Sequence, residues 1–164
     1  MPNRSVEKAF EKEIQENQLL IYKICRIYAD SQMGREDLYQ EIVLQLWKSF
    51  PKFRGESKFS TWLYRIAINT ALSGFRKQHR FIKSYEPALL PVHTEQPEVD
   101  IEEQTRELYQ AINRLNEIEK AIVVLYLEDR TYDEMEEILG INNGALRVKM
   151  NRIKEKLRQL TKNI

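Results

Sequence analysis

The sequence is poor in the residues that form cross-links, break helices or bind metals. It has 164 residues, with one cysteine, five glycines and two histidines. The single cysteine, Cys25, excludes an internal disulfide, and its apolar neighbours predict a buried thiol. No Cys/His cluster, nucleophile constellation or phosphate-binding loop is present. We therefore expect no catalytic residues, metal or cofactor, and no enzymatic activity.

Long apolar runs are also absent. Charged residues interrupt every such run, and none approaches the roughly 20 residues needed to cross a bilayer. Arg4, Glu7, Lys8 and Glu11 break up the pattern of a signal peptide. We therefore expect a cytoplasmic protein with no membrane insertion.

The scarcity of glycine and the apolar spacing of three and four predict an all-α protein. Three helices are expected in the first half, over residues 6–29, 35–50 and from after residue 57 to about 82. Gly34 is expected to separate the first two, and Pro51 to end the second.

The second half carries clear helix boundaries. Asn116 with Glu119 and Thr131 with Glu134 predict two capping boxes. Gly140 is expected to end the second of these helices in a left-handed turn. Asn142 or Asn143 then caps a last helix, whose apolar stripe consists of Leu146, Met150, Ile153, Leu157 and Leu160.

Charge divides the chain into segments. Residues 1–85 hold 15 bases and 9 acids, residues 86–107 hold 1 base and 7 acids, and residues 143–164 hold 7 bases and 1 acid. We predict two small helical domains, residues 1–85 and 105–164, joined by an acidic, proline-containing linker, residues 86–104. Two basic surfaces suggest two contacts with one polyanion, although charged helices can also be simply solvated.

Aromatic and basic residues alternate between Phe53 and Arg80, and residues 60–85 contain no acid. Rings and cations together suit unpaired nucleic acid. A helical wheel places a polar strip between two apolar faces, and the strip contains Arg65, Asn69, Ser73 and Arg76. Phe59 and Trp62 are expected in the core rather than against bases.

The last two helices form a helix-turn-helix pattern. Its exposed face is expected to enter a major groove and holds Ala145, Arg147, Val148, Lys149, Asn151 and Arg152. A plain helical hairpin with a solvated basic face is the alternative. Glu136 fits poorly, because a carboxylate packed between the two helices is costly unless a cation such as Arg147 pairs with it.

These blocks resemble bacterial RNA polymerase sigma factors of the extracytoplasmic-function type. The runs DLYQEIVLQLW (37–47) and FRGESKFSTWLYRIAINTA (53–71) resemble region two of that family. The run TYDEMEEILGINNGALRVKMNRIKEKL (131–157) resembles region four. The resemblance implies that the chain binds core RNA polymerase and promoter DNA and directs transcription initiation.

The resemblance also implies roles for particular residues. Docking on the β′ clamp helices of polymerase falls to Asp37, Leu38, Gln40 and Glu41. Reading of the minus-ten element falls to Phe53, Arg54, Gly55, Glu56, Ser57, Lys58, Arg65, Asn69, Ser73 and Arg76. Reading of the minus-thirty-five element falls to Asn143, Ala145, Arg147, Val148, Lys149, Asn151 and Arg152, in a domain that also docks on the β flap. An anti-sigma factor is a further partner expected from the family.

The recognition helix departs from the family pattern. Gly-Thr-Val-Lys-Ser-Arg is often found where this chain has Gly-Ala-Leu-Arg-Val-Lys, residues 144–149. Ala145 lacks a phosphate-binding hydroxyl, and Val148 suits a thymine methyl. Two other functions stay open at this point. One is a stand-alone helix-turn-helix regulator of duplex DNA, and the other is a sigma-like decoy that only occupies polymerase.

Overall fold

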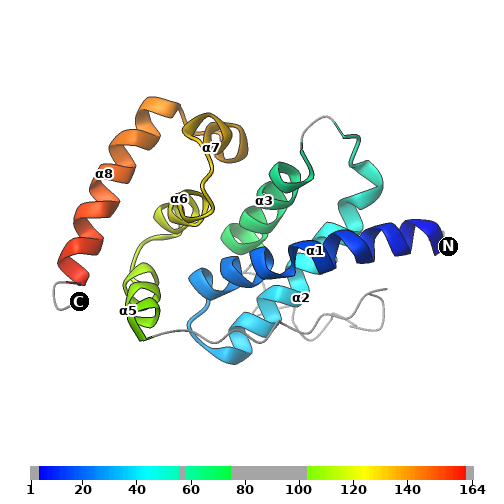
Figure 1. Ribbon diagram of the computed structural model, residues 1–164, viewed down its shortest axis with the longest axis horizontal. Coiled ribbons are helices and arrows are strands. Elements are labelled where there is room, and N and C mark those ends of the chain that lie inside the picture. The colour runs from blue at the N-terminus through cyan, green and yellow to red at the C-terminus, as the bar shows by residue number, and fades with distance from the viewer. Residues whose placement is uncertain (1–3, 56–57, 75–102, 162–164) are drawn as a thin grey trace.

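A computed structural model describes residues 4–55, 58–74 and 103–161. These residues are helical and contain no strand, in agreement with the all-α prediction (Figure 1). The elements are α1 (Arg4–Tyr28), α2 (Gln32–Ser49), a 3-10 turn (Phe50–Lys52), α3 (Phe59–Asn69), a π-helical turn (Thr70–Gly74), α5 (Glu103–Ile112), α6 (Glu117–Leu127), α7 (Tyr132–Leu139) and α8 (Asn143–Leu160). Most of the predicted linker lies outside the described residues.

The boundary between α1 and α2 lies earlier than the sequence suggested. Ser31 is the N-cap of α2, and its hydroxyl accepts a hydrogen bond from the Gly34 N–H at 3.0 Å. Gly34 therefore lies in the first turn of α2, and the prediction that it separates the two helices was wrong. A Ser N-cap that satisfies an otherwise unpaired N–H explains the earlier start.

The third predicted helix changes its geometry near its end. It is α-helical from Phe59 to Asn69 and continues as the π-helical turn. The Thr70 hydroxyl donates to the carbonyl of Ile66 at 2.7 Å, a side-chain bond that competes with the backbone ladder. The predicted extension to residue 82 lies outside the described residues.

The predicted helix boundaries of the second half are confirmed. Both capping boxes are complete, with Asn116 paired to Glu119 and Thr131 paired to Glu134. Gly140 has a φ of 72° and donates its N–H to Glu136 O at 2.8 Å, as a left-handed C-cap requires. Local chemistry therefore defines these helices.

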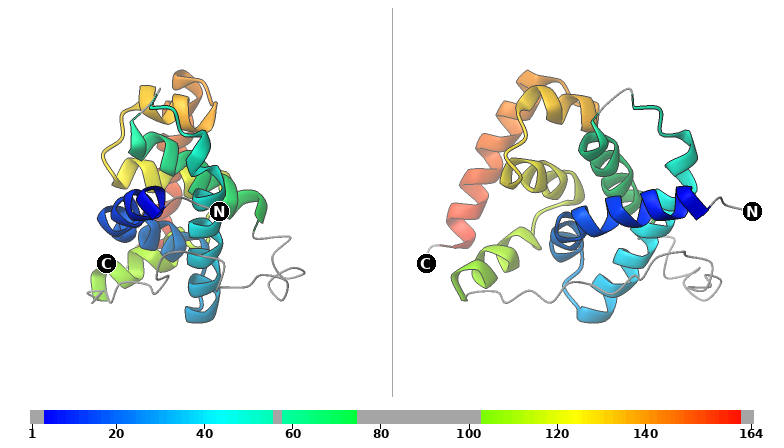
Figure 2. Two further views of the ribbon diagram at one scale, coloured as in Figure 1. Left: turned by 90° about the vertical axis from the view of Figure 1, so that its right-hand side faces the viewer. Right: turned by 45° about the vertical axis from the view of Figure 1, so that its right-hand side comes forward.

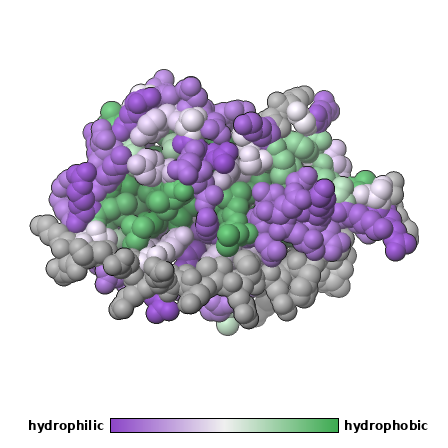
Figure 3. All heavy atoms as spheres, in the orientation of Figure 1, coloured by the Kyte–Doolittle hydropathy of each residue, from purple (hydrophilic) through white to green (hydrophobic). Residues whose placement is uncertain are grey.

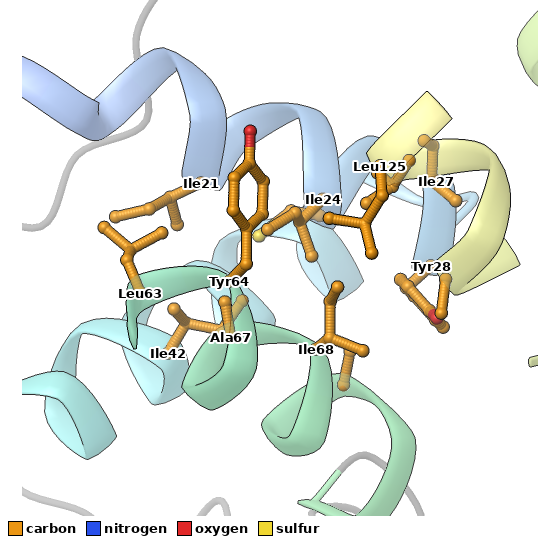
Figure 4. Close-up of a cluster of buried hydrophobic side chains, with 14 of the residues drawn as sticks. Ile21, Ile24, Ile27, Tyr28, Ile42, Leu63, Tyr64, Ala67, Ile68 and Leu125 are labelled. Carbon is orange, nitrogen blue, oxygen red and sulfur yellow. The ribbon is translucent and has the colours of Figure 1, made fainter. Parts of the chain in front are cut away.

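The two halves share one hydrophobic core (Figure 4). Leu125 of α6 lies beside Ile24 of α1 and Ile68 of α3, and all three are almost completely buried. Residue contacts pack α6 against α1 and α7 against α3, and Figures 1 and 2 show these pairs as neighbours. We call this packing of α1 on α6 and α3 on α7 the closed arrangement.

Polar contacts also cross between the two halves. The Tyr28 hydroxyl donates to Glu117 O at 2.8 Å, and Lys23 pairs with Glu128 at 2.9 Å. Burial raises the pKa of Tyr28 above its ordinary value, and nearby Glu117 adds to the shift. Tyr28 therefore stays neutral as a hydrogen-bond donor within the interface.

Cys25 is fully buried on α1, as predicted. Burial raises the pKa of its thiol far above the usual range, which makes a reactive thiolate unfavourable. Its role is packing.

Candidate nucleic-acid interface

The recognition helix α8 presents a basic face to solvent. The first three residues of its predicted apolar stripe, Leu146, Met150 and Ile153, are each at most 2% exposed, whereas Leu157 is half-buried and Leu160 is exposed. The predicted DNA-facing side chains are all exposed: Ala145, Arg147, Val148, Lys149, Asn151 and Arg152. Figure 2 shows α8 on the outer side of the molecule, away from α1 and α3. This geometry leaves the face accessible to a DNA groove.

Glu136 has a role that differs from the prediction. It is exposed rather than packed between the helices, and its carboxylate accepts a hydrogen bond from the Asn143 N–H at 3.0 Å. The N-terminus of a helix attracts negative charge, so no cation partner is required. The expected desolvation cost does not arise, and Glu136 instead caps α8 from the preceding helix.

Asn143 is half-buried and both ends of its amide have partners within the protein. Its Nδ2 donates to Asp133 Oδ1 at 2.8 Å, and its Oδ1 accepts from Arg147 Nε at 2.8 Å. These bonds brace the start of the recognition helix, and direct contact of Asn143 with DNA stays a prediction.

A groove of about 640 Å³ lies between the start of α6 and the basic side of α8. Lys149, Arg152 and Lys156 line it together with Glu119. Partial burial opposes ionisation of Glu119, but hydrogen bonds from Lys156 and from the Asn116 N–H lower its pKa overall. Glu119 of α6 is therefore ionised at neutral pH and holds Lys156 of the recognition helix in place through their 2.7 Å ion pair.

The polar strip of α3 is divided between two environments. Asn69 is exposed, whereas Arg65 is half-buried and its Nη2 donates to Glu137 O on α7 at 3.0 Å. Both faces beside the strip are buried, with Leu63, Tyr64 and Ile68 at most 1% exposed. A helix buried on two sides was predicted, but one of the elements that pack against it, α7, comes from the second half of the chain. The side chain of Ser73 and all of Arg76 lie outside the described residues.

The loop before α3 contains both exposed and packed residues. Arg54, Gly55 and Lys58 are exposed, and Gly55 has a φ of 73°. The Phe53 ring lies 5.1 Å from that of Trp62 and 5.6 Å from that of Phe59, so it belongs to an aromatic cluster. This packing anchors the loop at Phe53, and contact of Phe53 with a base stays a prediction. Glu56 and Ser57 lie outside the described residues.

The predicted polymerase-docking segment lies on α2. Asp37, Gln40 and Glu41 are partly exposed, but Leu38 is completely buried in the core. A side chain with no accessible surface cannot contact a partner, so the assignment of Leu38 to docking was wrong. The helical spacing of Leu38 and Ile42 pointed to this burial.

Comparison with known proteins identifies the family. Residues 14–81 match the model for sigma-70 region 2, and residues 105–157 match the model for sigma-70 region 4. The chain belongs to the sigma-70 family. It is 33% identical over 132 residues to the ECF RNA polymerase sigma-E factor of Haemophilus influenzae, covering 73% of this chain and 70% of the relative. It is 26% identical over 157 residues to the ECF sigma factor SigW of Bacillus subtilis, covering 88% and 84%.

Two solved structures share the fold of this sigma factor. The sigma factor RpoE, in complex with the anti-sigma factor NepR from Bartonella quintana, gives a TM-score of 0.72 at 20% identity, covering 95% of this chain and 98% of that chain. CnrH, in complex with the cytosolic domain of CnrY, gives 0.65 at 18% identity, covering 93% and 87%. The likeness extends over both helical units.

The chain is thus a sigma factor that acts with core RNA polymerase and directs initiation at promoters. The region 2 match disfavours a stand-alone helix-turn-helix regulator. The family is generally non-catalytic. Within residues 4–55, 58–74 and 103–161, no group of His, Cys, Asp and Glu is arranged to hold a metal. In the same ranges no helix has the length and apolar character to cross a membrane.

Sequence reasoning missed several residues of this sigma factor. Tyr132 lies beneath Arg147, whose guanidinium carbon is 4.6 Å from the ring centre. Tyr126 and Leu127 of α6 are 44% and 45% exposed. In Figure 3, apolar residues gather between hydrophilic ones on the face that carries α6. The near-continuous apolar run of α6 was the available signal for an exposed apolar position there.

Proposed function

We propose that this sigma factor contacts polymerase at two places and reads two promoter elements, one with each unit. Region 2, residues 1–85, docks on the β′ clamp helices through Asp37, Gln40 and Glu41. Region 4, residues 105–164, docks on the β flap. The acidic linker, residues 86–104, runs between them along polymerase. The protein acts in the cytoplasm, where polymerase and promoters meet.

The exposed basic face of α8 is the observation that carries the proposal. Arg147, Lys149 and Arg152 stand on a helix whose opposite side is buried, and the preceding residues 115–141 hold 2 bases and 8 acids. Phosphates are therefore attracted to α8 and repelled from the helices behind it. Arg suits guanine, and Asn151 suits adenine, in the major groove of the minus-thirty-five element.

Region 2 reads the opened minus-ten element. Exposed Arg54 and Lys58 flank a loop whose backbone is anchored by Phe53, and this loop captures a flipped base. Asn69 is exposed inside a helix, where Asn is intrinsically unfavourable, which supports a role in contact with the strand. Arg65, Ser73 and Arg76 complete the strip along the phosphates.

The two units must separate for both elements to be read at once. About 25 base pairs at about 3.4 Å each, or about 85 Å of duplex, lie between positions −10 and −35. A compact chain of 164 residues has a radius of gyration of about 15 Å. The linker of residues 86–104 can span at most about 65 Å when extended. We therefore expect polymerase to select an open form in which α1 leaves α6 and α3 leaves α7.

Transcription in vitro with core polymerase and a promoter pool tests the function. We expect the chain to bind core and to direct initiation at a defined subset of promoters. Asn69→Ala should impair strand opening, seen as lower permanganate reactivity, while core binding is kept. Asn17→Ala on α1 is the matched control. Equal loss of core affinity in Asn69→Ala would place Asn69 in the fold instead.

A second pair of variants tests region 4. Arg152→Ala should weaken dependence on the minus-thirty-five sequence, whereas Arg158→Ala, farther along the same helix, should not. Unchanged promoter preference in Arg152→Ala would contradict the role of α8. Failure to initiate at every promoter, despite core binding, would instead favour the decoy function.

We also propose an anti-sigma partner that binds the apolar surface of α6. The adjacent exposed side chains of Tyr126 and Leu127 support it, because neighbouring exposed apolar residues can form an interaction site. Two structural relatives were solved with a bound partner. A candidate anti-sigma domain should inhibit transcription by the wild type but not by Leu127→Asp. Leu160→Asp, at the far end of α8, is the control, and equal inhibition of all three proteins would contradict this surface.

A further inference from the structure

A chain of hydrogen bonds crosses the turn between α7 and α8. Asp133 on α7 accepts from the amide nitrogen of Asn143, and the amide oxygen of Asn143 accepts from Arg147 Nε, with both distances 2.8 Å. A carboxylate only accepts and a guanidinium only donates, so these two partners fix the orientation of the Asn143 amide. Each link therefore orients the next.

Arg147 has a second contact that limits its rotation. Its guanidinium carbon lies 4.6 Å from the centre of the Tyr132 ring, and Tyr132 packs partly against the core. The bond to Asn143 uses Nε, so recognition of guanine falls to Nη1 and Nη2. These two nitrogens form the bidentate fork that matches guanine O6 and N7.

Glu136 holds the same point of α8 through the backbone. It accepts from the Asn143 N–H at 3.0 Å, while Asn142 Oδ1 accepts from the Gly144 N–H at 2.8 Å. The backbone N–H groups of Asn143 and Gly144 in the first turn of α8 thus have hydrogen-bond acceptors, one from α7 and one from the turn before α8. Asn143 is held at both its backbone and its side chain by residues of the preceding helix.

We propose that Asp133 and Glu136 are positioning residues that hold Asn143 and, through it, Arg147 for base reading. In this way they determine the base preference at the minus-thirty-five position that Arg147 contacts. The inference rests on the proposed function of α8 and deepens it. Both carboxylates hydrogen-bond to Asn143 within the protein, so the role proposed for them is to position Asn143 rather than to contact DNA.

The expected gain is one of preorganisation. An unrestrained arginine loses rotamer freedom when it binds, and holding it in place beforehand removes part of that cost, roughly 2- to 10-fold in affinity per side chain. The gain applies only where the fork meets its base. Loss of Asp133 should therefore reduce discrimination at one promoter position rather than binding to all sequences.

The experiment uses the full chain with core polymerase and promoters randomised at each minus-thirty-five position. The variants are Asp133→Ala, Arg147→Ala, the double variant and Glu137→Ala. Glu137 loses a carboxylate from the same helix, and the bond from Arg65 goes to its backbone oxygen, which the substitution leaves in place. We expect Asp133→Ala to reduce discrimination 2- to 10-fold at the position affected by Arg147→Ala, with Glu137→Ala unchanged.

The double variant separates positioning from folding. If Asp133 acts through Arg147, the double variant should match Arg147→Ala alone, because no arginine remains to be held. Effects that multiply, or a uniform loss over all promoters in Asp133→Ala, would overturn the proposal. Asp133→Asn keeps an acceptor oxygen, so it should retain most of the discrimination and serves if the alanine variant folds poorly.

Variants of Glu136 provide an independent test of the proposal. Glu136→Gln retains an oxygen for the Asn143 N–H and should keep discrimination, whereas Glu136→Ala should reduce it at the same promoter position. If Arg147→Ala itself leaves promoter discrimination unchanged, Arg147 does not read a base, and the positioning proposal is overturned with that assignment. An effect of Arg147→Ala with no coupling to Asp133 or Glu136 would overturn the positioning alone.

Discussion

Nζ of Lys23 on α1 lies 2.9 Å from Oε1 of Glu128, the residue that follows α6. This ion pair joins region 2 to region 4, as does the hydrogen bond from the Tyr28 hydroxyl to Glu117 O. The two side chains keep 41% and 19% of their exposure, so solvent screens the pair. Its contribution is of the order of 0.2–1 kcal/mol, and apolar burial supplies most of the stability of the closed arrangement.

Reversal of one charge should shift the chain toward the open form. Lys23→Glu places two carboxylates together, and we expect the ratio of open to closed forms to rise by up to about 5-fold. Fluorescence transfer between labels at Met33→Cys and Arg158→Cys, both exposed positions, measures the separation. The swap Lys23→Glu with Glu128→Lys should restore the closed population. If the double variant has as large an open population as either single variant, the pair does not hold the two units together.

The boundaries of the second-half helices followed from sequence because each rests on chemistry within a few residues. Asn116 with Glu119, Thr131 with Glu134, and Gly140 have partners close along the chain. The buried positions Leu146, Met150 and Ile153 of the α8 stripe followed for a similar reason, since their period is a property of one helix. The candidate site residues of α8 could be predicted equally well, because they are the helix positions that the apolar stripe leaves exposed.

Contacts between the two units were not predictable from periodicity. Tyr64 and Ile68 form an apolar face of α3, but the pattern does not say that α6 and α7 cover it. Glu136 is a related case, because its partner is a backbone N–H that any residue at position 143 other than proline would provide. Leu38 was assigned to docking by analogy, although its spacing with Ile42 already indicated a place in the core.

Stability should depend on pH through Glu119. Its pKa is lowered in the folded state, so the folded chain binds the proton less tightly than the unfolded chain does. This contribution is complete above the ordinary Glu pKa of about 4.3 and is lost as the pH falls through the folded value. Glu119→Gln should therefore lower the free energy of unfolding at pH 7, with the deficit shrinking toward pH 3.5.

Urea denaturation at several pH values measures this difference. Glu155→Gln is the control, because it removes an exposed pair with Arg158 on α8 and should change stability by no more than about 0.5 kcal/mol. A deficit of Glu119→Gln that is constant from pH 7 to pH 3.5 would indicate that the charge of Glu119 is not involved.

Stability and polymerase affinity should separate on α2. Leu38 is fully buried, so Leu38→Ala leaves a cavity and should cost about 2–5 kcal/mol of unfolding free energy. Glu41 is partly exposed and accepts one hydrogen bond from Gln45 four residues on, so Glu41→Ala should cost about 0.5 kcal/mol or less. Core binding, measured by anisotropy of a labelled chain, should weaken for Glu41→Ala. Full affinity in that variant would remove Glu41 from the docking surface.

Val148 and Met150 should separate base reading from folding on α8. Val148 is 50% exposed and Met150 is 2% exposed, although they are two residues apart. Val148→Ala should leave the melting temperature unchanged and reduce the preference for thymine at one minus-thirty-five position, because a methyl contact is lost. Met150→Ala should lower the unfolding free energy by about 2–5 kcal/mol without altering which base is preferred. Promoter selection and thermal denaturation of the same two variants measure both effects. If Val148→Ala lowers the melting temperature as much as Met150→Ala does, Val148 packs within the protein and its place on the reading face is wrong.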